Sequence, residues 1–178
     1  GVSSAMNIGW TSPSFMGTTL KLAVAPGGNK AAFSNDKSVG GVNTEKQAGY
    51  DALIEIKPSF GVDALSGWTV WAGGSETDQD VKNAGVTGND HQEVNAGTTF
   101  AYGPVTVGFQ RMGEFTGSET AGATDYYQNQ AFGVSFNVSD NLSISYGEFE
   151  SVRKMIGSGT TIKSVTAETQ SFQIAYTM

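Results

Sequence analysis

Apolar residues recur at every second position in about nine segments of the sequence, and this period limits the chain to β-structure. In "FGVSFNV", for example, Phe132, Val134 and Phe136 alternate with Gly133 and Ser135. Successive side chains of a strand point to opposite faces, so each segment would have one apolar face and one small or polar face. Helical periodicity is absent over any useful length. We expect strands near residues 4–12, 17–25, 47–57, 67–74, 92–102, 104–113, 127–138, 141–150 and 163–177.

Composition narrows the surroundings in which such a sheet can fold. Charged residues make up 15% of the 178 residues, against about 25% in an ordinary soluble domain. The sequence has no run of apolar residues long enough for a transmembrane helix, which leaves the closed β-barrel as the route across a bilayer. The net charge of -7 argues against a nucleic-acid partner. The chain has no cysteine, so disulfides and cysteine-ligated metals are excluded.

The links between the expected strands alternate in length. The short links contain turn residues such as Gly, Pro, Asp and Asn, and lie at 12–16, 58–66, 103–104 and 139–140. The long links are rich in Gly, Asn, Asp, Ser and Thr, and lie at 26–46, 75–91, 114–126 and 151–162. Strict alternation of tight turns and long loops is typical of outer-membrane barrels, whose turns face the periplasm and whose loops face outward.

Aromatic residues are placed near the ends of many expected strands. Amphipathic rings prefer the interface between water and hydrocarbon, so this placement also favours a membrane barrel over a soluble sandwich. The residues concerned are Trp10, Phe15, Phe60, Trp68, Phe100, Tyr102, Phe109, Tyr146 and Tyr176.

The stretch "WTSPSFMG", residues 10–17, resembles the Tyr-x-Ser-Pro-x-Phe-x-Gly hairpin of Gram-negative trimeric general porins. Ser12, Pro13, Phe15 and Gly17 match, and Trp10 takes the place of the tyrosine. The later stretches "TTFAYGPVTVGFQRM" and "FGVSFNVSDNLSISYGEFES" are similar to later hairpins of the same family. The resemblance implies an all-β, antiparallel up-and-down transmembrane barrel, of which residues 1–178 form one partial domain.

The chain departs from that family in two respects. Family members have sixteen strands on roughly twice this length, and their inward-folded constriction loop has no counterpart here. About nine strands would leave two open edges, and the chain stops at Met178 without the family's terminal aromatic residue. We therefore expect an interior-to-later segment of a larger barrel.

The resemblance implies a water-filled channel for passive diffusion of small hydrophilic solutes and ions across the bacterial outer membrane. It implies a homotrimer in contact with outer-membrane lipid and lipopolysaccharide, no cofactor and no enzymatic activity. Polar residues on the face opposite the apolar one would line the pore. These candidates are Lys21, Asp51, Glu55, Lys57, Asn95, Thr99, Gln110, Ser135, Asn137, Ser143, Ser145 and Gln173.

Catalytic and metal motifs are weak in this sequence. His91 is the only histidine and lies at the edge of a polar segment, where a solvated side chain is expected. Acidic and amide residues in the same link offer oxygen ligands for Ca²⁺ but lack the EF-hand spacing, so a solvated acidic loop is expected instead. They are Glu76, Asp78, Asp80, Asn89 and Asp90.

Two alternatives stay open from the sequence. A soluble or surface-attached β-sandwich or adhesin segment would have the same alternation, with its apolar faces buried against a second sheet and its long loops used for binding. An outer-membrane enzyme built on a barrel would need a catalytic cluster around His91.

Overall fold

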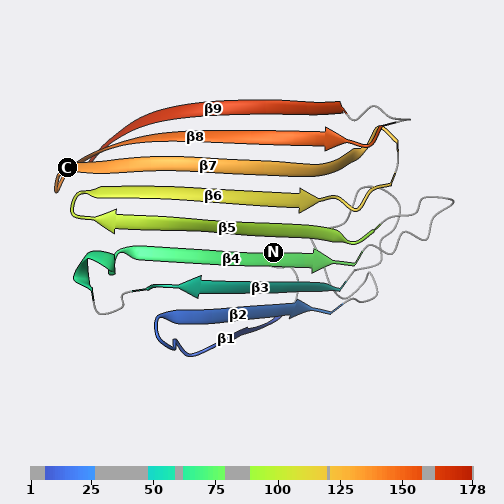
Figure 1. The fold of residues 1–178 in the computed structure, drawn as a ribbon, viewed down its shortest axis with the longest axis horizontal. Helices are drawn as coiled ribbons and strands as arrows, with labels where there is room; N and C mark the ends of the chain where they lie inside the picture. The colour runs from blue at the N-terminus through green and yellow to red at the C-terminus, as the bar shows by residue number, and fades with distance from the viewer. Residues whose placement is uncertain are drawn as a thin grey trace.

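The computed structural model describes residues 7–26, 48–58, 62–78, 89–119, 121–157 and 163–177. These residues form one nine-stranded antiparallel sheet whose spatial order follows the sequence from β1 to β9 (Figure 1). The strands are β1 Ile8–Thr11, β2 Thr18–Ala25, β3 Gly49–Ile56, β4 Trp68–Thr77, β5 His91–Tyr102, β6 Val105–Phe115, β7 Thr124–Ser139, β8 Leu142–Met155 and β9 Lys163–Tyr176. A single 3-10 turn, η1 Asp63–Leu65, precedes β4. No helix among these residues is long and apolar enough to cross a membrane.

The nine expected strands and their up-and-down connection are confirmed, but four strands extend further at the long-link end of the sheet than expected. β4 continues to Thr77, β6 to Phe115 and β8 to Met155, and β7 begins at Thr124. Backbone pairing continues there although apolar residues no longer recur at every second position, so the alternation on which the prediction rested is lost. Because β6 and β8 are longer than expected, Phe109 and Tyr146 lie inside their strands and away from the ends.

Short and long connections lie at opposite ends of the sheet. Two-residue turns join β5 to β6 at Gly103 and Pro104, and β7 to β8 at Asp140 and Asn141, at the left of Figure 1. The links after β2, β4, β6 and β8 leave from the other end. Residues 27–46 of the first predicted long link, 79–88 of the second, 120 of the third and 158–162 of the fourth lie outside the described residues. Phe60 and Asp80 are also outside them.

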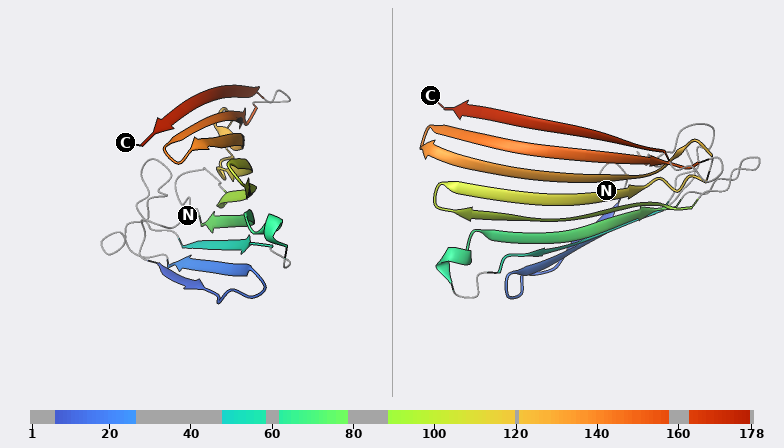
Figure 2. Two further views of the ribbon diagram at one scale, coloured as in Figure 1. Left: turned by 90° about the vertical axis from the view of Figure 1, so that its left-hand side faces the viewer. Right: turned by 45° about the horizontal axis from the view of Figure 1, so that its top comes forward.

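The two faces of the sheet differ as the alternation predicts. Leu22 on β2 pairs with Ala52 on β3, and Ile144 on β8 pairs with Ile174 on β9, so apolar residues of neighbouring strands share one face, called here the apolar face. The sheet is curved (Figure 2), and the opposite face, called here the polar face, contains an open concavity that is described below. β1 and β9 form its two edges, and over the described residues it is not closed into a barrel.

The apolar face has no covering layer among the described residues. Phe172 and Ile174 are 66% and 65% exposed, and Phe132 in the middle of the sheet is 46% exposed. The buried residues of the described part of the chain are Ala25, Gly49, Pro58 and Thr77, and they include no large apolar side chain. Exposed apolar surface of this extent is typical of a face that contacts a membrane or another protein.

The proline hairpin between β1 and β2 turns at Met16 and Gly17. Phe15 and Thr18 exchange two backbone hydrogen bonds of 2.9 Å around them. Both turn residues have positive φ, 49° for Met16 and 79° for Gly17, as in a type I′ turn. The sequence suggested that Pro13 lies in the turn; it lies before the turn, in an irregular stretch where its missing N–H costs no ladder bond. Ser12 closes the ladder there, because its hydroxyl accepts the Leu20 N–H at 2.9 Å.

Replacing Met16 with Asn should stabilise this hairpin. Met16 is 84% exposed and makes little packing contribution, while asparagine tolerates positive φ better and Asn-Gly favours a type I′ turn. We expect the free energy of unfolding to rise by about 0.5–1 kcal/mol, measured by denaturant unfolding followed by circular dichroism. Ser14→Asn, in the same hairpin but without positive φ, is the control. Equal stability of Met16→Asn and wild type would contradict the turn assignment.

Trp71 of β4 packs across Gly97 of β5 on the polar face. A Cβ built on Gly97 would lie 2.3 Å from the Trp71 ring and 2.8 Å from the Phe109 carbonyl oxygen. The two residues are directly opposite in the ladder. The indole therefore occupies the space that a side chain at position 97 would need.

The substitution Gly97→Ala should displace the Trp71 ring and lower the free energy of unfolding by about 1–3 kcal/mol, as overpacking does. Gly108→Ala is the matched control on the same face, because its Cβ would make only ordinary contacts, with the Thr99 methyl at 3.4 Å and the Thr98 carbonyl oxygen at 3.7 Å. Denaturant unfolding followed by circular dichroism measures both. Equal effects of the two substitutions on the free energy of unfolding would show that the packing of the Trp71 ring does not require glycine at position 97.

Candidate functional site

Pairing between strands places the predicted polar residues on one face of the sheet. Antiparallel partners that lie directly opposite share a face. Thus Gln110 pairs with Gly97 and Ser145 with Gln173, and Lys57 contacts Glu55 on this side just after β3. The structure places the following candidates on this polar face: Lys21, Asp51, Glu55, Asn95, Thr99, Gln110, Ser135, Asn137, Ser143, Ser145 and Gln173. Asn137 lies at a register irregularity, and the pore-lining role of the set is part of the proposal below.

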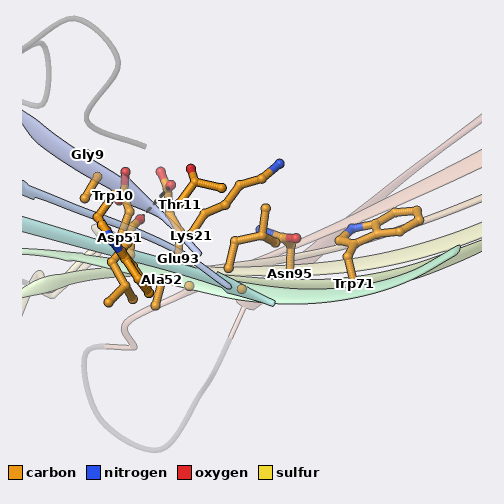
Figure 3. Close-up of a pocket in the computed structure, with 15 residues that line it drawn as sticks. Gly9, Trp10, Thr11, Lys21, Asp51, Ala52, Trp71, Glu93 and Asn95 are labelled. Carbon is orange, nitrogen blue, oxygen red and sulfur yellow. Dashed lines mark hydrogen bonds between the residues drawn. The ribbon is translucent and has the colours of Figure 1, made fainter. Parts of the chain in front are cut away.

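The polar face is hollowed between β1 and β5. Lys21, Asp51, Trp71 and Asn95 line an open concavity of about 510 Å³, and in Figure 3 the Lys21, Asn95 and Trp71 side chains stand on its side of the sheet. Small residues such as Gly73 form its floor. Strands 2 to 5 thus bring together a cation, an anion, an amide and an indole that are far apart in the sequence.

Charged side chains on this face contact one another or nearby hydroxyls. Lys57 Nζ lies 3.3 Å from Glu55 Oε1, with side-chain exposures of 62% and 29%. Such an exposed pair contributes little to stability but leaves two opposite charges close to the surface. Ser75 Oγ donates to Glu93 Oε2 at 3.1 Å.

Two acidic residues and Ser75 were missed by the sequence analysis. Glu93 is two residues before Asn95, so strand parity alone could have found it. Glu114 pairs with Glu93, but it was assigned to a long link because β6 was expected to end at 113. Leu53 and Trp71 are apolar residues on the same face, so the alternation of polar and apolar residues is less regular there.

His91 was expected in a polar segment, and it is instead the first residue of β5, with a side chain only 13% exposed. Its Nε2 lies 3.1 Å from Glu114 Oε1. The partner of His91 is thus a carboxylate and not a serine hydroxyl. The contact does not resemble one in which a histidine activates a serine nucleophile.

Three acidic residues at the end of β4 and before β5 lie close together at the same end of the sheet. Glu76, Asp78 and Asp90 have carboxylate oxygens within 4.8 Å of one another. Partial burial and the nearby Asp90 and Glu76 carboxylates raise the pKa of Asp78 above its usual value. Asn89 donates to Glu119 at 3.0 Å, so it is turned toward another residue.

No protein-family model matches the chain, and no curated protein is significantly similar to it. The arrangement of residues on the two faces is therefore the basis of the functional proposal.

Proposed function

We propose that this chain is part of a transmembrane β-barrel in the bacterial outer membrane, a porin through which small hydrophilic solutes and ions diffuse passively. The observation that carries the proposal is the shape of the apolar surface. Apolar residues of the apolar face form a band that crosses the sheet diagonally, and strands tilted in a bilayer would produce that diagonal.

The slope of the band follows from the strand register. The apolar run of β2 is centred on Leu22, and that of β8 on Ile144. In the ladder, Leu22 is level with Ala52, Gly74, Val94, Gly113, Gln128 and Val152. Val152 lies 152 - 144 = 8 residues beyond Ile144. The centre of the band therefore shifts toward the short turns by eight residues over the six steps from β2 to β8.

This shift corresponds to a definite strand tilt. Eight residues along a strand span about 26 Å, and six strand spacings span about 29 Å, which gives an angle of about 40°. Strands of outer-membrane barrels tilt by about 35–45° from the membrane normal. A face packed against a second sheet in a soluble sandwich has no reason to follow a plane at this angle, so the slope favours the membrane.

The positions of the charged residues on the apolar face are consistent with the same strand tilt. Glu150 and Glu168 pair across β8 and β9, and each lies six residues from the centre of its apolar run, Ile144 or Ile174. At about 40° of tilt, six residues place them about 15 Å from the midplane, outside an apolar band about 25 Å tall. The charged strand residues of this face all lie on the long-link side of the centre of the band: Glu76, Arg111, Glu148, Glu150, Lys154 and Glu168. Glu148, four residues from Ile144, is about 10 Å from the midplane and still within the band.

The concave polar face would line the water-filled lumen in this proposal. Hydroxyl, amide and charged side chains there replace part of a solute's hydration, and no cofactor or catalytic step is needed. Closure requires further strands between β1 and β9, because hydrocarbon cannot satisfy unpaired edge N–H and C=O groups. A sixteen-stranded barrel and a homotrimer follow from the family resemblance, and contact with lipopolysaccharide would involve the long-link end.

Planar-bilayer recording with the full-length protein tests the proposal. We expect stable, ion-conducting channels. Lys21→Gln should raise the ratio of cation to anion permeability, because it removes a positive charge from the lumen wall, where charges act over about 8–10 Å. Arg111→Gln, which removes a positive charge from the opposite face, is the matched control and should change the ratio little.

Two results would contradict the porin. One is a folded protein in buffer without detergent, as expected for the soluble sandwich. The other is a selectivity that responds equally to the Lys21 and Arg111 substitutions, since that would remove the distinction between the two faces.

A further inference from the structure

Three potential metal-ligating side chains lie together on the polar face at the end of the sheet from which the long links leave. His91 and Glu93 are on β5, and Glu114 lies opposite Glu93 on β6. Ligand atoms of the three residues are all within 4.8 Å of one another. His91 Nε2 and Glu114 Oε1 are 3.1 Å apart, a separation that two neighbouring ligands of one ion also have when each bond is about 2.0–2.2 Å.

The surroundings of this cluster contain two buried polar atoms without a hydrogen-bond partner. One is Nδ1 of His91. The other is the Oγ1 atom of Thr77, a residue only 1% exposed that lies directly opposite His91 in the ladder. Buried polar groups normally have partners. Two unpartnered atoms so close to the cluster, one on His91 itself and one on Thr77, therefore point to a bound polar species. The Ser75 hydroxyl, 3.1 Å from Glu93 Oε2, orients that carboxylate as outer-sphere partners of metal ligands do.

We propose that His91, Glu93 and Glu114 bind a divalent transition-metal ion, with Zn²⁺ the best match. An imidazole with two carboxylates suits Zn²⁺, whereas Mg²⁺ and Ca²⁺ prefer an all-oxygen set. Two carboxylates and a neutral imidazole also balance the charge of a divalent cation. The ion would join β5 to β6 close to the point where β6 leaves the sheet. The site requires only the pairing of β5 with β6, so it does not depend on the proposed pore function.

The site is distinct from the neighbouring group of Glu76, Asp78 and Asp90. That group contains only carboxylates, and none of its own atoms is among the partner-free buried atoms of the described residues. It therefore serves as the internal control for adventitious cation binding.

Zinc titration of the folded wild-type protein tests the site without any substitution. Residues 1–178 contain a single histidine, so the ring signals that this part of the protein contributes to an NMR spectrum of ¹⁵N-histidine-labelled protein belong to His91. Zn²⁺ should shift these signals with one ion bound per chain at this site, and an equal concentration of Mg²⁺ should not. Bound Zn²⁺ that leaves the histidine signals unchanged would overturn the proposal.

Calorimetric titration of variants then assigns the ligands. His91→Ala and Glu114→Gln should each weaken Zn²⁺ binding by about tenfold or more. Glu55→Gln on the same face and Asp78→Asn in the acidic group should weaken it by less than about twofold. Zn²⁺ affinity that falls only with Asp78→Asn would assign the ion to the acidic group and overturn the proposal. If a ligand variant does not fold, the wild-type histidine signals decide.

Discussion

The antiparallel backbone ladder is the constraint on which the rest of this structure depends. It joins each strand to the next in sequence order, and it fixes which residues lie level across the sheet. Because side chains alternate along a strand, one register decides the face of every residue in it. The apolar face, the concave polar face, the packing of Trp71 over Gly97 and the His91 cluster all follow from that pairing.

The diagonal band adds something that alternation alone does not contain. The alternation of side chains along a strand separates the two faces, but it does not give the position of a residue along the membrane normal. The register supplies that height, because Leu22 and Val152 are level in the ladder while the apolar runs of their strands are offset by eight residues. The same offset accounts for the positions of Glu150 and Glu168 on the apolar face.

Period-two alternation was sufficient to predict the number of strands, their order and the shared face of the polar candidates. It failed where the regular alternation is lost, as in β4 beyond Gly74 and β8 beyond Glu150, although the backbone ladder continues there. For the same reason the cluster of His91, Glu93 and Glu114 was missed, since it depends on pairing between a strand end and a segment assigned to a link. The position of Pro13 before the turn depends on positive φ at Met16, which the residue type does not suggest.

The depth of single residues in a bilayer tests the central claim most directly. Residues 1–178 contain no cysteine, so Leu22→Cys, Ile144→Cys and Val152→Cys can each carry one fluorophore in a full-length protein that is free of other cysteines and reconstituted into liposomes. Quenching by lipids with a nitroxide at the bilayer centre then reports depth. With strands tilted by about 40°, labels at 22 and 144 should be quenched strongly and alike, and the label at 152 weakly. Strong quenching at 152 with weak quenching at 144, or no quenching at any of the three, would contradict the account.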